Sequence, residues 1–309
     1  MESREFTQPV ILVTGAYGLL GSRVVPLLAL SIPGCQIIAS GRTKKSVHFS
    51  APNVRAMFGD LRDAQFWTRL PDTITQVVHL AAVIPWKVED RNQASLLTDN
   101  LLPLEHLVEH SQRWPDFQQI IYGSSVSVYG QTSEYLTEAS ARQPANLYGA
   151  SKLAGEELLG RPGAIDVRHV SLRFSSLYGY GQHQGTVLPI MVGRARQKQP
   201  LLVFGNGLRA QDFLHCDDAA RAILLSFQKR AEGVYNVGAG IPVSMKELAQ
   251  TVSRVFAGGA AQIVFQPDQP DDDSGIKLDI SKARRDLDYQ PAMLLESGLQ
   301  KLKLELEAG

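Results

Sequence analysis

Short apolar runs alternate with longer, helix-compatible segments along the first half of the chain. The runs are rich in β-branched residues and have the length of buried strands: 10–14, 35–39, 53–58, 76–80 and 118–125. Helix-compatible segments follow the first and fourth runs, at residues 22–30 and 93–113. Because strands that alternate with helices are joined by right-handed crossovers, the pattern predicts an α/β protein with a parallel sheet.

The second half of the chain adds amphipathic segments at residues 189–199 and 245–256, which predict helices with a buried apolar stripe. We therefore expect a doubly wound parallel Rossmann sheet with a smaller C-terminal α/β substrate domain. Residues 1–174 and 214–240 are assigned to the domain of the large sheet, and residues 175–213 and 241–309 to the smaller domain.

The first apolar run ends in a glycine-rich turn, Gly15-Ala-Tyr-Gly18-Leu-Leu-Gly21, directly before a helix-compatible segment. Glycines let the backbone turn sharply and approach a ligand, while the free N–H groups and the positive dipole end of the helix face an anion. The turn therefore predicts a site for a dinucleotide pyrophosphate, although its spacing differs from the commoner G-x-G-x-x-G. Pro26 stands inside the following segment and predicts a kinked or shortened helix.

The residues after the second run indicate which dinucleotide is bound. An NAD enzyme usually has Asp or Glu here, about 20 residues past the glycines, to accept hydrogen bonds from the ribose 2′-hydroxyl. This chain instead has Ser40 and Arg42, followed by Lys45. Their donors and positive charge suit a 2′-phosphate and favour NADP over NAD, and the alternative is a solvated basic loop.

The third and fourth runs end in candidate cofactor contacts. Asp60 is placed either to accept from an adenine amino group or to cap a helix, and the sequence leaves both roles open. The small side chains of Ala81 and Ala82 allow close approach of a cofactor to the backbone.

Candidate chemistry lies after the fifth run. Tyr148 and Lys152 are four residues apart and share one face of a predicted helix, and Ser125 ends the fifth run. An adjacent ammonium favours phenolate, so we expect a lowered Tyr148 pKa and an acid–base role for this residue, with Ser125 orienting the substrate oxygen. The alternative is a surface Tyr and Lys that are neighbours by chance.

Composition limits the partners. The chain has 309 residues with 31 basic and 31 acidic side chains scattered along it, which predicts no nucleic-acid partner. Cys35 and Cys216 match no metal spacing and are expected to be reduced core thiols, so no metal site is predicted. With a polar N-terminus and no apolar run near the ~18 residues of a membrane span, we expect no membrane partner and a cytoplasmic location.

The motifs together resemble the extended short-chain dehydrogenase/reductase family, also called the NAD(P)-dependent epimerase/dehydratase family. The matched motifs run nearly end to end, through Thr14-Gly-Ala-Tyr-Gly-Leu-Leu-Gly21, Gly59-Asp-Leu61, His79-Leu-Ala-Ala82, Asn100, Ser124-Ser-Val-Ser-Val-Tyr-Gly130, Tyr148…Lys152, Leu172-Arg-Phe-Ser-Ser-Leu-Tyr-Gly179, Asp212-Phe-Leu-His-Cys-Asp-Asp218 and Tyr235-Asn-Val-Gly238. The resemblance implies a catalytic triad of Ser125, Tyr148 and Lys152. It also implies cofactor contacts, which we assign to Gly15, Tyr17, Gly18, Leu19, Leu20, Gly21, Ser40, Arg42, Asp60, Leu61, Ala81, Ala82, Asn100, Tyr148 and Lys152. By the same resemblance we expect a homodimer formed through a four-helix bundle.

Departures from the family pattern narrow the expected substrate. Members that dehydrate nucleotide sugars have Asp and Glu where this chain has Val126 and Ser127, so a 4,6-dehydratase is not expected. Ser176, Gln211 and Gln269 replace an Asn and two Arg that commonly hold a nucleotide diphosphate, although Arg209 offers a substitute. The sequence therefore predicts a small-molecule substrate that is not a nucleotide diphosphate sugar.

The resulting functional prediction is an NADP-dependent oxidoreductase that transfers hydride to or from a secondary alcohol or ketone. One alternative is a nucleotide-sugar epimerase, which uses the same three residues without net redox change. The other is a non-catalytic NADP sensor, a class that has usually lost the Tyr-x-x-x-Lys pair that this chain retains.

Overall fold

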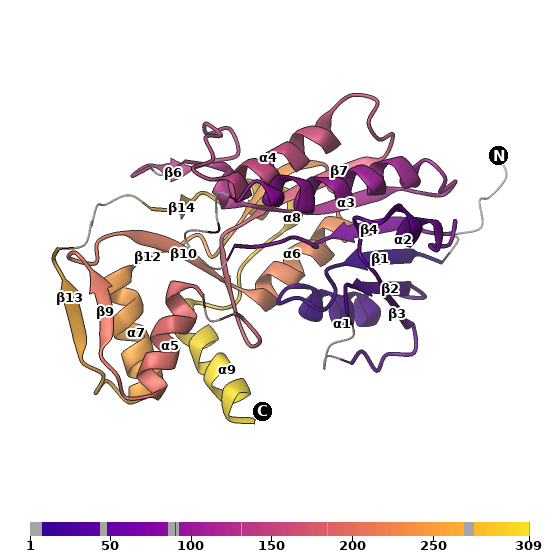
Figure 1. Ribbon diagram of the computed structural model, residues 1–309. Coiled ribbons are helices and arrows are strands. Elements are labelled where there is room, and N and C mark those ends of the chain that lie inside the picture. The colour runs from indigo at the N-terminus through magenta and orange to yellow at the C-terminus, as the bar shows by residue number, and fades with distance from the viewer. Residues whose placement is uncertain are drawn as a thin grey trace.

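The computed structural model describes residues 8–43, 48–85, 90, 93–130, 132–183, 185–268 and 275–308. Lys45, Gln269 and the acidic residues 271–273 lie outside the described residues. Figure 1 shows a large sheet covered by helices and, beside it, a smaller group of strands and helices built mostly from the second half of the chain.

The large sheet has seven strands in the order β3-β2-β1-β4-β5-β7-β11, all parallel. Its strands are β1 (Val10–Thr14), β2 (Gln36–Gly41), β3 (Val54–Phe58), β4 (Gln76–His79), β5 (Gln119–Ser125), β7 (Arg168–Phe174) and β11 (Gly233–Val237). The first five coincide within two residues with the apolar runs of the sequence. The order reverses between β1 and β4, as in a doubly wound fold, so the predicted fold class is confirmed.

Helices cover both faces of this sheet. α1 (Gly21–Ser31) packs beside α6 (Cys216–Gln228) on one face, and α3 (Ser95–Ser111) packs beside α4 (Leu147–Gly160) on the other (Figure 1). Successive side chains of a strand point to opposite faces of the sheet, and in β1 both faces are apolar. Ile11 and Val13 lie in the core under α1 and α6, and Leu12 lies in the core under α3 and α4. The short helices α2 (Ala64–Thr68) and α8 (Ser281–Leu287) complete this part of the fold.

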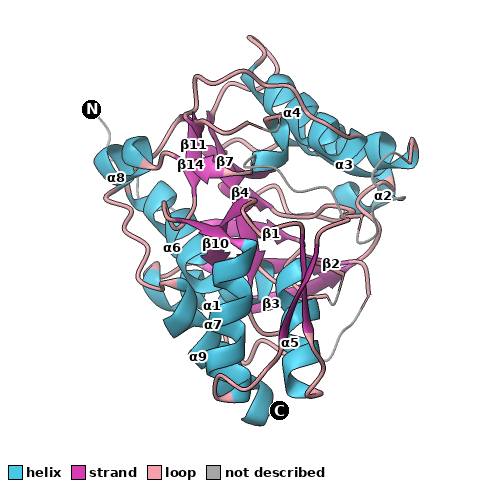
Figure 2. Ribbon diagram, turned by 90° about the vertical axis from the view of Figure 1, so that its left-hand side faces the viewer, coloured by secondary structure: helices cyan, strands magenta, loops and turns pink. Residues whose placement is uncertain are grey.

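The remaining elements form smaller sheets and a helical layer. β8 (Ser176–Tyr178), β10 (Ala210–His215) and β12 (Pro242–Ser244) form one sheet; β9 (Leu201–Phe204) pairs with β13 (Ile263–Gln266), and β6 (Tyr135–Leu136) with β14 (Lys277–Leu278). α5 (Val187–Arg196), α7 (Met245–Ala257) and α9 (Leu295–Ala308) gather at one end of the molecule, where Figure 2 shows them together. They share a core that includes Leu188, Val192, Leu248, Val252 and Leu299. The proposed domain boundaries stay a prediction.

Several local expectations are settled by the structure. Pro26 does not end its helix, since α1 continues to Ser31. Asp60 caps no helix, because the side chain that caps α2 is that of Asp63. Cys35 and Cys216 are both free and buried, as expected. Among the described residues, no helix is long and apolar enough to cross a membrane.

Candidate active site

The candidate site lies at the carboxyl ends of the parallel strands. β1 pairs with β2 on one side and with β4 on the other, so the crevice of the reversed strand order opens beyond Thr14 and His79. Ligands of open α/β sheets bind at the carboxyl ends of the strands where the strand order reverses. The glycine turn and the residues Ala81 and Ala82 follow these two strands directly.

Two glycines of the turn, Gly15 and Gly21, are packed so closely that neither position accommodates a side chain. Gly15 has φ +68°, and a Cβ on it would lie 2.7 Å from the backbone nitrogen of Ala81. A Cβ on Gly21 would lie 2.2 Å from the carbonyl oxygen of Gly15, whereas Gly18 is exposed at the apex of the turn and donates its N–H to Gly15 at 2.9 Å. At these two positions the turn is therefore formed by backbone alone.

Directly after this turn, α1 begins with backbone contacts only, since Ser22 N–H donates to the Gly18 carbonyl at 3.0 Å and Arg23 N–H to the Leu20 carbonyl at 3.0 Å. Its N-cap residue is Leu20, and among the described residues no side chain caps this end of the helix. Leu19 contributes through its backbone, since its carbonyl accepts the Ser22 hydroxyl at 3.0 Å. An uncapped helix start beside a glycine cradle fits the pyrophosphate of a dinucleotide, so the predicted cofactor residues suit the group they were assigned to hold.

The candidate contacts around β2 divide into buried and exposed groups. The Tyr17 ring is buried, with its centroid 5.2 Å from the centroids of both Phe49 and Phe58. Ser40 is fully buried, its Oγ has no partner among the described residues, and its backbone carbonyl accepts from Ala16 at 3.0 Å. Tyr17 and Ser40 thus support the glycine turn from the interior of the protein. Arg42, by contrast, is exposed at the end of β2.

Asp60 lies in an ion-pair network that the sequence did not reveal. Arg62 donates to both Asp60 oxygens, with Nη2 to Oδ2 at 2.6 Å, and its Nη1 donates to Asp99 of α3 at 2.7 Å. The hydrogen bonds from Arg62 lower the pKa of Asp60 to about 2, and the Arg42 charge contributes to the shift. Asp60 is therefore an ionised, partly exposed acceptor beside Leu61, whose carbonyl accepts from Trp67 Nε1 at 2.8 Å.

Asn100 fixes the loop that contains Ala81 and Ala82. Its Oδ1 accepts from the backbone of Val83 at 2.7 Å, and its Nδ2 donates to Ser151 of α4 at 3.0 Å. The side chain is only 4% exposed, so its amide is committed to protein groups. Asn100 thus holds the loop after β4 against α4, and its contact with the cofactor stays a prediction.

The structure brings Ser125, Tyr148 and Lys152 together. The Ser125 side chain, at the end of β5, lies within hydrogen-bonding reach of Tyr148 in the first turn of α4, and its Oγ donates to Ser127 Oγ at 3.1 Å. Lys152 lies one turn later, where its Nζ is 6.0 Å from the Tyr148 ring centroid and donates to the Gly123 carbonyl at 2.7 Å. Helix α4 is capped by Asn146, whose side chain accepts from the backbone of Gly149 at 2.9 Å.

The expected lowering of the Tyr148 pKa was wrong. Burial raises the pKa of Tyr148 to about 12, and the hydrogen bond with Ser125 opposes this shift only in part. Burial also lowers the pKa of Lys152 to about 8, with the Glu156 carboxylate opposing that change. The loss of hydration around the phenol outweighs the hydrogen bond with Ser125, so Tyr148 carries its proton at neutral pH and is chemically a proton donor.

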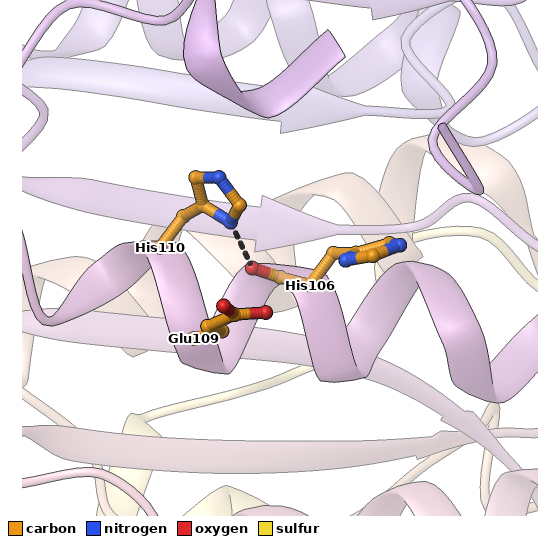
Figure 3. Close-up of side chains that lie close together, drawn as sticks. All are labelled: His106, Glu109 and His110. Atoms are coloured by element: carbon orange, nitrogen blue, oxygen red, sulfur yellow. Dashed lines mark hydrogen bonds between the residues drawn. The ribbon is translucent and has the colours of Figure 1, made fainter. Parts of the chain in front are cut away.

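Within the described part of the chain, two groups of side chains that could hold a metal ion lie outside this site, and the sequence analysis singled out neither. Figure 3 shows the first on α3, where Nδ1 of His110 donates to the carbonyl oxygen of His106 at 3.0 Å while Glu109 lies on the near side of the helix. In the second, at the start of α6, the Nδ1 of His215 accepts from the backbone of Asp217. These hydrogen bonds serve the helices themselves, and the absence of a metal site stays a prediction.

Comparison with known proteins identifies the family. The model described as the NAD dependent epimerase/dehydratase family matches residues 11–238. The chain belongs to this family. It is therefore a member of a family of NAD-dependent enzymes, and the resemblance predicted from its motifs is confirmed.

Individual relatives add detail. A trifunctional UDP-glucose 4,6-dehydratase/UDP-4-keto-6-deoxy-D-glucose 3,5-epimerase/UDP-4-keto-L-rhamnose-reductase of Arabidopsis thaliana is 27% identical across 97% of this chain. The chain spans about half the length of that relative, 47%. A putative UDP-glucose 4-epimerase of Methanocaldococcus jannaschii is 27% identical and matches 95% of this chain and 97% of its own. The UDP-glucose 4-epimerase of Thermotoga maritima, solved with UDP-glucose, has a TM-score of 0.84 and 25% identity over 97% of this chain and 99% of its own.

These relatives overturn the prediction that the substrate is not a nucleotide diphosphate sugar. Their names specify UDP-sugars, and the Thermotoga maritima structure contains UDP-glucose. The error has a physical reason, because Ser176 and Gln211 report only on their own positions, whereas a diphosphate can be neutralised by cations elsewhere in a cleft. The third position used in that argument, Gln269, lies outside the described residues.

Proposed function

We propose that this protein transfers hydride to or from a secondary alcohol of a nucleotide diphosphate sugar, using a nicotinamide dinucleotide. The observation that carries the proposal is the convergence of Ser125, Tyr148 and Lys152 beside the crevice of the glycine turn. When bound, the dinucleotide supplies the hydride acceptor or donor. Gly15, Gly18 and the start of α1 would hold its pyrophosphate, and Ala81 and Ala82 would allow its close approach.

The three converging side chains have separate roles in this proposal. Tyr148 gives a proton to the sugar oxygen during reduction and removes it during oxidation. Ser125 orients that oxygen and keeps the phenol aligned through their hydrogen bond. Lys152 supplies positive charge next to the phenol. This charge stabilises the phenolate that remains after Tyr148 donates its proton in reduction, which is the same phenolate that accepts the sugar proton in oxidation.

Two full-length relatives favour an epimerase over a net reductase. The Methanocaldococcus jannaschii and Thermotoga maritima proteins, both named UDP-glucose 4-epimerases, match this chain over nearly all of their own length. An epimerase oxidises and then reduces the same carbon, so it returns its cofactor unchanged. Incubation with UDP-glucose and NAD(P)+ separates the two functions: we expect a 4-epimer to form without net formation of NAD(P)H. Stoichiometric formation of NAD(P)H together with a ketone would instead identify an enzyme with net redox turnover.

We also infer a preference for NADP. Arg42 is exposed at the end of β2, where a ribose 2′-phosphate would lie, and a guanidinium binds phosphate through charge-assisted hydrogen bonds. Titration of the protein with NAD and with NADP tests this inference. Equal affinity for the two cofactors would reject it.

We further propose that Arg209 contributes positive charge to the substrate diphosphate. Arg209 is exposed and stands two residues before Gln211, where the sequence lacks the expected arginine. In a thermal-shift experiment with saturating NADP, micromolar UDP should stabilise the wild-type protein and the control Arg161→Ala, which alters an exposed arginine just after α4. The same UDP should not stabilise Arg209→Ala, and equal stabilisation of all three proteins would show that Arg209 takes no part.

A further inference from the structure

Three consecutive residues at the end of β5 are each bound to a different turn of α4. The Gly123 carbonyl accepts from Lys152 at 2.7 Å, the Ser124 hydroxyl donates to the Glu156 carboxylate, and Ser125 is hydrogen-bonded to Tyr148. Two of these contacts involve the candidate acid–base pair. The middle one involves Glu156, a carboxylate that no step of the proposed reaction uses.

Glu156 is buried together with its counterion. It is 6% exposed and Arg173 of β7 is 1% exposed, with Arg173 Nη2 donating to Glu156 Oε2 at 2.6 Å and Nε to Oε1 at 2.9 Å. Arg173 is fixed from its other side, since its Nη1 donates to the Tyr129 hydroxyl at 2.7 Å and the Tyr129 hydroxyl donates to Asn236 at 2.7 Å. The carboxylate is therefore held by a network that extends to β11 and is independent of any ligand.

Helix α4 packs tightly against β5 and the turn that follows it. A Cβ on Gly155 would lie 2.4 Å from the Tyr122 hydroxyl, and a Cβ on Gly149 would lie 2.1 Å from the Ser127 carbonyl oxygen. The helix thus touches β5 and the turn after it with almost no space between them. Tyr148, Lys152 and Glu156 follow one another at intervals of four residues, so the three side chains lie along this contact.

We propose that Glu156 is a positioning residue, which through Ser124 and Arg173 fixes α4 against the end of β5 and places its negative charge one turn from Lys152. This inference rests on the proposed roles of Tyr148 and Lys152. The ammonium is surrounded by His79 of β4, Tyr122 of β5, and Tyr148 and Glu156 of α4, with Arg173 of β7 behind Glu156. Among these groups, Glu156 supplies the negative charge that opposes the lowering of the Lys152 pKa by burial.

Ser124→Ala tests the contact between strand and helix. It removes one hydroxyl from a buried carboxylate, and Ser175→Ala is a matched control because the Ser175 hydroxyl donates to the buried carboxylate of Asp212 at 2.6 Å. We expect Ser124→Ala to lower kcat roughly 10- to 100-fold with little change in KM, as for a small misplacement of reacting groups. The control should lose comparable stability and keep its kcat, and a Ser124→Ala enzyme as active as the control would overturn the positioning role.

Glu156→Gln tests the charge. Removal of the Glu156 charge should lower the Lys152 pKa by about one, which is at the lower end of the effect that a neighbouring charge has on a pKa. NMR titration of the labelled lysine measures this pKa without any turnover, and an unchanged value would overturn the electrostatic part of the proposal. If Glu156→Gln does not fold, Ser124→Ala decides alone. Tyr148→Phe distinguishes a failure of the proposed function from a failure of the proposal for Glu156. Full activity of Tyr148→Phe would reject the proposed function, and the NMR titration would still decide the role of Glu156.

Discussion

Replacing Gly15 with alanine should damage both folding and cofactor binding, and a matched glycine allows the two causes to be separated. Gly15 and Gly163 have nearly equal backbone angles, φ +68° and φ +76°. Alanine in this left-handed region costs about 1–2 kcal/mol at either position. The surroundings differ, because a Cβ on Gly163 meets no described atom within 4 Å, whereas a Cβ on Gly15 lies 2.7 Å from Ala81 N and 2.9 Å from Leu80 C.

The atoms that crowd Gly15 belong to the backbone just after β4. The clash with a new Cβ is therefore removed only if the turn or the end of the strand moves. Such overpacking typically costs about 1–3 kcal/mol more. Urea unfolding should therefore show Gly15→Ala less stable than Gly163→Ala by about 1–3 kcal/mol, while unfolded-state effects of Gly→Ala are common to both variants. Calorimetric titration with NADP should show weaker binding only for Gly15→Ala. Equal stability and equal cofactor affinity of the two variants would refute this account of the turn.

Three further predictions follow from individual charges. Arg42→Ala should weaken NADP binding roughly 10- to 150-fold and leave NAD binding nearly unchanged by calorimetry, because one charge-assisted contact of about 1.5–3 kcal/mol is lost, and equal losses for both cofactors would contradict it. Arg173→Met should lower the free energy of unfolding by about 3–5 kcal/mol, since Glu156 is left buried without a counterion, and a loss below about 1 kcal/mol in urea titration would reject the role of the pair. Burial lowers the Lys152 pKa from 10.5 to about 8, so the unfolded chain binds more protons between these pH values and this group makes stability rise with pH there. Lys152→Met should lack that rise relative to wild type, and identical pH profiles of unfolding would contradict the shift.

Features encoded by neighbouring residues were predictable from the sequence. The β1 run, the glycine turn and the start of α1 are contiguous, so strand, turn and helix could be inferred before any tertiary contact was known. The pairing of Tyr148 with Lys152 followed from helical spacing alone. Both inferences needed only the local periodicity of the backbone.

Features that depend on distant partners were not predictable. Arg62 joins Asp60 to Asp99. The sequence does not indicate this contact, because Asp99 lies on α3, far from Arg62 along the chain. The direction of the Tyr148 pKa required knowledge of burial, and helix spacing shows only which charges are near. Ser40 was assigned a ligand contact from its place in the chain, but the fold turns its hydroxyl into the interior.

The expected homodimer was also inferred from family resemblance. The homodimer and its four-helix bundle stay a prediction. Sedimentation analysis of the protein at micromolar concentration checks the oligomeric state directly.

The central claim is that Tyr148 exchanges a proton with a sugar hydroxyl during hydride transfer. The most direct measurement compares wild type and Tyr148→Phe in turnover of UDP-glucose with NADP or NAD, with product followed by NMR. Loss of one phenolic hydroxyl should reduce kcat about 10²- to 10⁴-fold, while cofactor affinity changes little. A Tyr148→Phe enzyme with kcat within a few-fold of wild type would contradict the account.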